Sequence, residues 1–102
     1  MTAPARTGSA AKWDAVRITS VDQVAVAVRD LVGPVTILAG KELMHCLVPS
    51  LIPMGHKFAL FDMPAGTEIR KFGQVIGVLT QATRAGEHVH IHNLTSLRAR
   101  AR

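Results

Sequence analysis

The sequence is poor in residues that several classes of protein require. Its 102 residues include one cysteine, one tryptophan, three phenylalanines and no tyrosine. A single cysteine cannot form a disulfide within the chain, so nothing argues for an oxidising compartment and we expect a cytoplasmic protein. The scarcity of aromatic rings disfavours proteins that stack nucleic-acid bases. The longest uninterrupted apolar run, 24–28, is far shorter than the roughly 20 residues of a membrane-spanning helix.

The positive charges gather at the two ends of the chain. The net charge is +5, and five of the 12 lysines and arginines lie in the first 12 or the last five residues. The other seven balance the seven acidic residues. We predict a flexible arm at 1–17, a folded domain at 18–97 and a basic tail at 98–102. Solvated ends explain this pattern better than a nucleic-acid interface, which normally places its charge on a structured face.

The length limits what the chain can do alone. A domain of about 100 residues buries roughly 60–70% of the surface of its unfolded chain. Little room is left for both a rigid core and a large enclosed substrate pocket. We therefore expect a subunit, an adaptor or a small binding module rather than a self-sufficient enzyme.

Short strands dominate the pattern of apolar residues. Residues 23–29 alternate valine with smaller residues, which predicts a strand with one apolar face. Residues 30–34, which end in Gly33-Pro34, read as a turn. Further strands are predicted at 35–38 and 43–48. Residues 44–47 could instead form a helical turn.

The form turn, glycine, strand recurs three times in the second half, at 53–59, 64–70 and 84–90. Each glycine suits a tight turn with positive φ, which only glycine adopts at little cost. With the earlier strands this pattern predicts seven or eight short, bent strands in a compact all-β domain with little helix.

Three histidines alternate near the end of the chain, at His88, His90 and His92. Alternate side chains of a strand share a face, so the three imidazoles would point one way while Val89 and Ile91 pack inward. Neighbouring Cα atoms on that face lie roughly 6.5–7 Å apart, which lets two rings, but not three in a straight row, bind one ion. The pattern predicts His88 and His90 as metal ligands with further ligands from elsewhere. The alternative is a solvent-facing strand that binds nothing.

A second polar cluster, His56 and Lys57, directly follows Gly55. Lysine supplies positive charge, and imidazole can exchange a proton near neutral pH, so the pair could bind an anionic group. The alternative is an ordinary surface loop. His45 and Cys46 lie between apolar neighbours and are predicted to pack rather than to bind an ion.

An ordered series of motifs resembles a known family. The motifs are Val21-Asp22-Gln23-Val24-Ala25-Val26-Ala27, Gly55-His56-Lys57-Phe58-Ala59-Leu60, Ala65-Gly66, Lys71-Phe72-Gly73, Ile76-Gly77 and Ala85-Gly86-Glu87-His88-Val89-His90-Ile91-His92-Asn93. Together they resemble the small SAF-type domain of the altronate dehydratase and galactarate dehydratase family. The resemblance covers roughly residues 18–97, and it implies a β-clip fold.

The resemblance also implies a function. Members are lyases of sugar acids and related hydroxy acids, with one sulfo-lyase branch, and depend on a divalent metal, usually iron(II) or manganese(II). A separate small chain implies a large lyase subunit that shares the metal, and a homo-oligomer in isolation is a further option. The implied roles are metal ligands for His88 and His90, catalysis for His56 and Lys57, and substrate binding for His92 and Asn93. The alternatives are a non-catalytic module that binds a sugar acid and a basic-tailed nucleic-acid adaptor.

Overall fold

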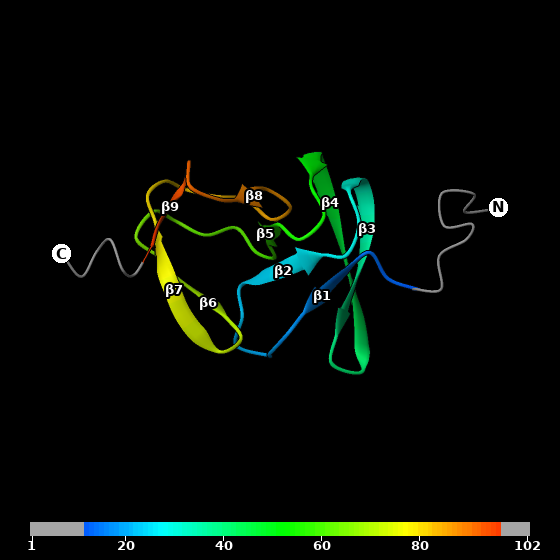
Figure 1. The fold of residues 1–102 in the computed structure, drawn as a ribbon. Coiled ribbons are helices and arrows are strands. Elements are labelled where there is room, and N and C mark those ends of the chain that lie inside the picture. Colours follow the sequence, from blue (N-terminus) through cyan, green and yellow to red (C-terminus); the bar gives the residue numbers. More distant parts are fainter. Residues whose placement is uncertain (1–11, 97–102) are drawn as a thin grey trace.

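Nine strands and no helix form within residues 12–96, the part of the chain that this computed structural model describes (Figure 1). They are β1 (Ala15–Arg17), β2 (Val24–Ala27), β3 (Leu31–Ala39), β4 (Glu42–Ile52), β5 (Lys57–Ala59), β6 (Glu68–Lys71), β7 (Gln74–Leu79), β8 (His88–Val89) and β9 (Leu94–Ser96). The prediction of an all-β domain of short, bent strands is confirmed. Within the same residues no helical segment could span a bilayer.

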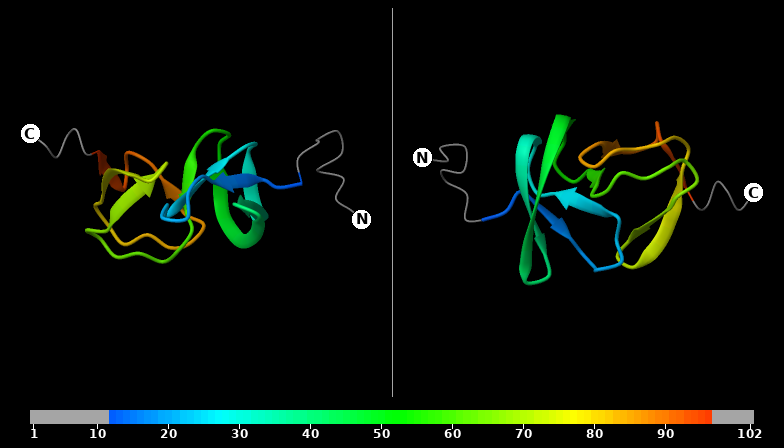
Figure 2. Two further views of the ribbon diagram at one scale, coloured as in Figure 1. Left: turned by 90° about the horizontal axis from the view of Figure 1, so that it is seen from below. Right: turned by 180° about the vertical axis from the view of Figure 1, so that it is seen from behind.

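The strands form a six-stranded sheet, β4-β3-β1-β2-β5-β8, and a three-stranded sheet, β6-β7-β9. All neighbours are antiparallel except β1 and β3, which run parallel. Figure 2 shows the long β3–β4 hairpin at one end of the molecule and the three-stranded sheet at the other. The six-stranded sheet curls, so that its two edge strands, β4 and β8, border the same surface cavity.

Two apolar clusters form the core, and β5 contributes to both. Phe58 belongs to a cluster with Ile37 and Ile52, whereas Ala59 points the other way into a cluster with Ile69. Burying an apolar side chain of this size contributes roughly 1.5–3 kcal/mol. The core therefore fixes β5, and β5 in turn pairs with β8, the strand that begins the histidine series.

All three predicted turn glycines have positive φ, and a strand follows each. The φ angles are 85° at Gly55 and 90° at both Gly66 and Gly86. Gly77, which belongs to the Ile76-Gly77 motif, lies inside β7 rather than in a turn. A side chain there would overlap the backbone oxygen of Thr95 in β9, so Gly77 permits close approach of two strands instead.

The last two copies of the repeat are linked by reciprocal backbone hydrogen bonds. The N–H of Gly66 donates to the carbonyl of Leu79 at 2.8 Å, and the N–H of Gly86 donates to the carbonyl of Ala59 at 2.7 Å. Each glycine turn is thus anchored to the strand that precedes the other turn. The exchange holds the segment that carries the histidines against β5.

The buried carboxylate of Asp22 joins the two sheets. Its Oδ1 accepts hydrogen bonds from the Thr19 hydroxyl and the Gly73 N–H, and its Oδ2 accepts from the N–H groups of Thr19 and Phe72, at 2.7–3.1 Å. Thr19 follows β1, whereas Phe72 and Gly73 form the turn between β6 and β7. Burial by itself raises the pKa of Asp22, but these hydrogen bonds outweigh it and hold the pKa below its ordinary value of 3.8.

The prediction of a turn at 30–34 is wrong, because β3 begins at Leu31 and runs through Gly33 and Pro34. A β-bulge between Leu31 and Gly33 absorbs the irregular backbone. Pro34 pairs with β4 but lies outside the stretch of β3 that pairs with β1, so its missing N–H removes no bond on that side. The predicted strand at 43–48 is confirmed as part of β4, which excludes the helical turn at 44–47.

The sheet begins earlier than the predicted domain boundary. β1 lies within the segment 1–17 that was expected to be an arm. Residues 1–11 and 97–102 lie outside the described residues, so the rest of the arm and the basic tail at 98–102 stay predictions.

Candidate functional site

Three imidazole rings converge on one place at the surface. A ring nitrogen from each of His56, His88 and His90 lies within 4.8 Å of the other two. The Nδ1 of His56 is 2.8 Å from the Nε2 of His88, a hydrogen-bond distance. The rings of His88 and His90 stack with centroids 5.1 Å apart and planes 8° apart. The two histidines of the predicted pair therefore share a face, and a third ring joins them from 32 residues earlier in the chain.

A glycine turn carries His56 to this place. The N–H of Gly55 donates to the carbonyl of Ala27 at 2.8 Å, and the carbonyl of His56 accepts from the N–H of Ala27 at 2.9 Å. β5 follows directly and pairs with β2 on one side and β8 on the other. The backbone of His56 is thus held by β2 while its side chain reaches His88.

Asn93 closes the turn that follows β8. Its Oδ1 accepts from the N–H of His90 at 2.9 Å, and its Nδ2 donates to the carbonyl of His88 at 2.9 Å and to the Thr83 hydroxyl at 3.4 Å. The Asn93 side chain is buried. It therefore positions the backbone beside two of the three imidazoles. Direct contact of Asn93 with a substrate stays a prediction.

The histidine series is only partly a strand, which corrects one expectation. β8 ends at Val89, and residues 90–93 form a turn in which the N–H of Asn93 donates to the carbonyl of His90. Val89 packs in the core as predicted, but the prediction that Ile91 packs inward is wrong, because 86% of its surface is exposed. His92 lies within this turn, and its ring centroid is 5.7 Å from that of His88.

The surroundings of His88 and His90 disfavour positive charge on these two rings, because they lower both pKa values. Burial is the largest cause that lowers the pKa of His88 and of His90 below the ordinary value of 6.5, and the neighbouring His56 is the next cause for both. His92 and Lys57 add smaller repulsions. Uncharged imidazoles keep a free ring lone pair, which is the form that binds a metal ion.

Lys57 lies beside His90 rather than in the main cavity. With His90, Ile76 and Ile91 it lines a separate surface hollow. Burial, and then the charge of Lys71, lower the pKa of the Lys57 ammonium below its ordinary value of 10.5. The structure thus makes His56 a member of the histidine cluster and places Lys57 beside His90.

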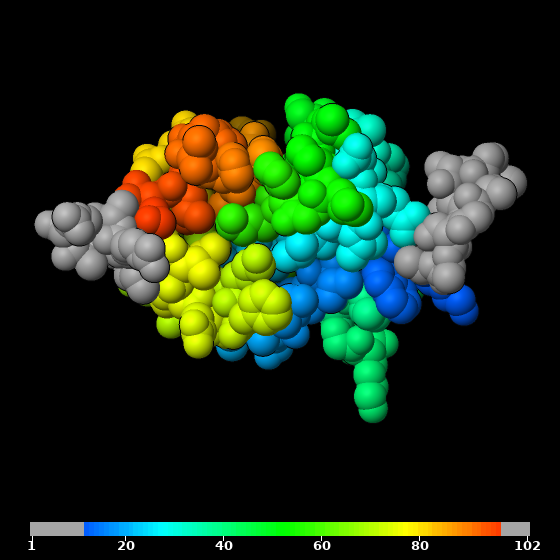
Figure 3. Space-filling model, in the orientation of Figure 1, coloured from blue at the N-terminus to red at the C-terminus, as the bar shows by residue number. Residues whose placement is uncertain are grey.

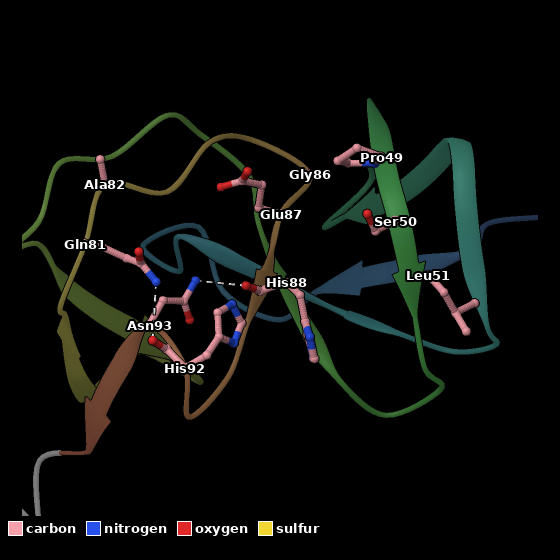
Figure 4. Close-up of a pocket in the computed structure, with 10 residues that line it drawn as sticks. All are labelled: Pro49, Ser50, Leu51, Gln81, Ala82, Gly86, Glu87, His88, His92 and Asn93. Atoms are coloured by element: carbon pink, nitrogen blue, oxygen red, sulfur yellow. Dashed lines mark hydrogen bonds between the residues drawn. The ribbon is translucent and has the colours of Figure 1, made fainter.

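The main cavity lies between β4 and residues 86–93, which we name the histidine segment. Its volume is about 410 Å³. Its lining residues are Pro49, Ser50, Leu51, Gln81, Ala82, Gly86, Glu87, His88, His92 and Asn93. Figure 4 shows the β4 residues on one side and the histidine segment on the other. Cavities of this size commonly hold small ligands.

Several lining residues were not identified from the sequence. Ser50 and Leu51 come from β4, and no local pattern marks them, because the curl of the sheet brings β4 to the cavity. Glu87 adjoins His88 in the motif that runs from Ala85 to Asn93, so its position beside a predicted metal ligand could have marked it as a cavity residue. Its Oε1 accepts from the N–H of Arg84 at 2.9 Å, so part of its role is to close the turn.

His45 and Cys46 do not join the cluster. Cys46 packs against the core as predicted, and burial raises the pKa of its thiol above the ordinary value of 9.0. The packing prediction for His45 is wrong, because this residue is exposed on β4.

The fold and the site together define a small all-β domain that presents a cluster of imidazoles beside an open cavity. The model of the altronate/galactarate dehydratase SAF domain matches residues 13–97. The chain belongs to this family, as its motifs predicted.

Named relatives fall into two groups. Altronate dehydratase of Escherichia coli (strain K12) is 35% identical over 78 residues, which cover 76% of this chain and 15% of that enzyme. Two proteins named (2R)-sulfolactate sulfo-lyase subunit alpha are much shorter. The one from Chromohalobacter salexigens is 41% identical, covering 50% of this chain and 54% of the relative, and the one from Paracoccus pantotrophus is 40% identical, covering 46% and 70%. The chain thus matches a small part of the dehydratases and more than half of the alpha subunits.

Proposed function

We propose that this chain is the small subunit of a metal-dependent lyase that dehydrates a sugar acid or a related hydroxy acid. The observation that carries the proposal is the convergence of three imidazoles beside an open cavity, in a chain that belongs to a dehydratase domain family. The short relatives named as alpha subunits support a multi-subunit enzyme. Because the cavity is open, a large subunit would supply the surface that excludes water.

The donor set of the cluster fits a divalent transition metal. Imidazole nitrogen is a common ligand of iron, cobalt, nickel and zinc, whereas magnesium, calcium and manganese favour oxygen ligands. Of the two metals that the family resemblance implied, the cluster therefore favours iron(II) over manganese(II). When bound, such an ion acts as a Lewis acid toward the carboxylate and α-hydroxyl of a substrate.

The remaining residues supply binding and orientation. The reaction removes a proton from the carbon beside the carboxylate and a hydroxyl from the next carbon, which together leave as water. In the proposed site the Lys57 ammonium attracts the substrate carboxylate from the side of His90, and His92 hydrogen-bonds a substrate hydroxyl in the main cavity. Asn93 holds the turn that positions both histidines. We also propose a cytoplasmic location, consistent with a single, half-buried cysteine.

The outer face of the β3–β4 hairpin supports docking of the large subunit. Leu43, Leu47 and Leu51 of β4 and Val32 of β3 are each more than half exposed, and Pro34 is paired with Leu47. Figure 3 shows the tip of this hairpin projecting from the body. These side chains form an apolar surface, which we name the hairpin face.

The hairpin face continues into the main cavity, because Leu51 belongs to both. Strands of nine and 11 residues cover roughly 320 Å², well below the roughly 800 Å² that each partner buries in a stable complex. A second copy of this chain on the hairpin face alone would therefore bury too little surface. A large subunit that docks here must therefore also cover surface beyond the hairpin face, and the adjoining main cavity offers it.

The test is reconstitution with the large lyase subunit. The two chains are purified separately, and dehydration of altronate, galactarate and related acids is followed by the appearance of the α-keto acid product. We expect turnover only from the mixture, and loss of turnover when the small chain carries His90→Ala but still binds the large subunit. Full turnover by the large subunit alone would contradict the proposal.

One other function has a specific observation in its favour. The main cavity lies on this chain alone and is large enough for a sugar acid, which suits a non-catalytic binding module. Binding of a sugar acid by the isolated chain, with no association with a large subunit, would favour that alternative.

A further inference from the structure

We propose that this chain binds a divalent transition-metal ion by itself, through one ring nitrogen each of His56, His88 and His90. The inference deepens the proposed function. It rests on that proposal only for the use of the ion in a lyase reaction, and not for the binding of the ion itself. It assigns His56 to the metal rather than to proton transfer, and it places three ligands on the small chain rather than dividing them between two subunits.

The ring nitrogens already lie near the positions that an ion requires. Metal–nitrogen bonds of about 2.0–2.1 Å place neighbouring nitrogens roughly 3.0–3.4 Å apart. The His56 Nδ1 and His88 Nε2 atoms, at 2.8 Å, would separate by a few tenths of an ångström. The third nitrogen lies within 4.8 Å of both, and a small ring rotation of a half-buried His90 brings it into range.

The apo cluster gives the His56–His88 pair a hydrogen bond that an ion would replace. In that bond one ring nitrogen donates its N–H, and the other accepts the hydrogen bond through its lone pair. Coordination of both nitrogens requires the donor ring to change tautomer, with its proton moving to its other nitrogen. No proton is gained or lost overall, so the exchange needs no further reactant.

The backbone that carries the ligands is fixed before an ion arrives. His56 is held by the β2 backbone and His88 by its pairing with β5. Asn93 binds the N–H of His90 and the carbonyl of His88 with one amide group. Supporting groups of this kind typically change metal affinity about 10–100-fold when they are removed.

The ligand set contains no carboxylate. Its three neutral nitrogens determine which metal ions the site prefers, and the uncompensated charge of the bound ion would attract anions. Three neutral nitrogens favour cobalt, nickel, zinc and iron(II) over magnesium and calcium. The bound ion would keep its full double charge with coordination positions open. Together with Lys57 this makes an anion-attracting centre, suited to the carboxylate of a hydroxy acid.

Two histidines of the described region lie outside the set and serve as controls. His45 is exposed on β4 and does not belong to the cluster. His92 lies beside His88 but outside the group of three. His45→Ala is therefore the matched control for the loss of one imidazole.

The experiment uses the full chain without a polyhistidine tag, stripped of metal with a chelator and titrated with Co²⁺ alone. The visible absorption of Co²⁺ reports its coordination, and competition with a chromophoric chelator gives the affinity. We expect one ion per chain, with a weakening of about 100-fold or more in His56→Ala, His88→Ala and His90→Ala and none in His45→Ala. A 100-fold excess of Mg²⁺ or Ca²⁺ should not displace the ion. Thermal unfolding of each variant shows whether it is folded.

The outcomes separate this inference from the proposed function. Unchanged affinity in His56→Ala would overturn the three-ligand set. Affinity that survives all three substitutions, or falls equally in His45→Ala, would place the ion elsewhere and overturn the inference entirely. If a ligand variant fails to fold, the Gln variant at the same position replaces it. None of these results depends on a large subunit or on turnover, so the lyase proposal fails or survives separately.

Discussion

The last two glycine turns of the repeat provide a matched pair of substitutions, Gly86→Ala and Gly66→Ala. Both glycines occupy the same turn position with a φ of 90°, so both alanines meet the same backbone cost. An alanine at positive φ costs about 1–2 kcal/mol, and reduced freedom of the unfolded chain offsets about 0.4–1 kcal/mol. Gly66 has nothing within 4 Å of the added Cβ. Gly66→Ala should therefore lower the free energy of unfolding by about 1 kcal/mol.

At Gly86 the added Cβ would overlap the backbone oxygen of Leu47 in β4. Non-bonded heavy atoms sit about 3.5–4.0 Å apart, so β4 and the histidine segment must separate. Overpacking of this kind costs about 1–3 kcal/mol, which brings the expected loss for Gly86→Ala to about 2–4 kcal/mol. The main cavity should widen as well, because Gly86 lines it.

Urea unfolding of both variants, followed by circular dichroism and linear extrapolation, measures the difference. We expect Gly86→Ala to be less stable than Gly66→Ala by about 2 kcal/mol. Equal losses would refute the reasoning, because they would mean that the Gly86 turn does not lie against β4. A loss confined to Gly66→Ala would contradict it even more directly.

Three further predictions concern stability, docking and substrate. Because the pKa of Asp22 is lowered in the folded chain, its stabilising effect is present above pH 3.8 and is lost as the pH falls through the folded value. Asp22→Asn should thus cost about 2–3 kcal/mol at pH 7 and progressively less in acid, and a loss independent of pH would argue against the carboxylate. Leu47→Glu should weaken binding to the large subunit about 30-fold, the size of a hot-spot loss of about 2 kcal/mol, whereas Val21→Glu on the β1–β2 turn should not. If a calorimetric titration shows that the two variants bind equally well, the hairpin face is not the docking surface for the large subunit. Lys57→Gln should raise the KM of the reconstituted enzyme for a hydroxy acid about tenfold, equivalent to about 1.4 kcal/mol. An unchanged KM would exclude Lys57 from carboxylate binding.

Local sequence signals predicted much of the fold. Alternating valines marked β2, and the three glycine turns marked the strands that follow them. The same signals failed at Gly33-Pro34, where a bulge and an unpaired side of β3 tolerate residues that usually end a strand. They also failed at Ile91, because the Asn93 side chain bonds the N–H of His90 and turns the chain where alternation predicted a longer strand.

The candidate site was predictable only in part. The spacing of His88 and His90 places both rings on one face from local geometry alone. The approach of His56 depends on the pairing of β5 with β8, which the core around Phe58 fixes and no short motif encodes. The β4 wall of the cavity depends on the curl of the whole sheet, so Ser50 and Leu51 carried no sequence signal.

The central claim is that the rings of His56, His88 and His90 form one centre. Long-range ¹H–¹⁵N NMR spectra of the imidazoles, recorded while Zn²⁺ is added to the full chain, follow each ring nitrogen separately. The account predicts that the ¹⁵N chemical shift of one nitrogen in each of these three rings changes in step and that the change saturates at one ion per chain. The ¹⁵N chemical shifts of His45 should stay constant. Shifts at His45 alone, or in only one ring of the three, would contradict it.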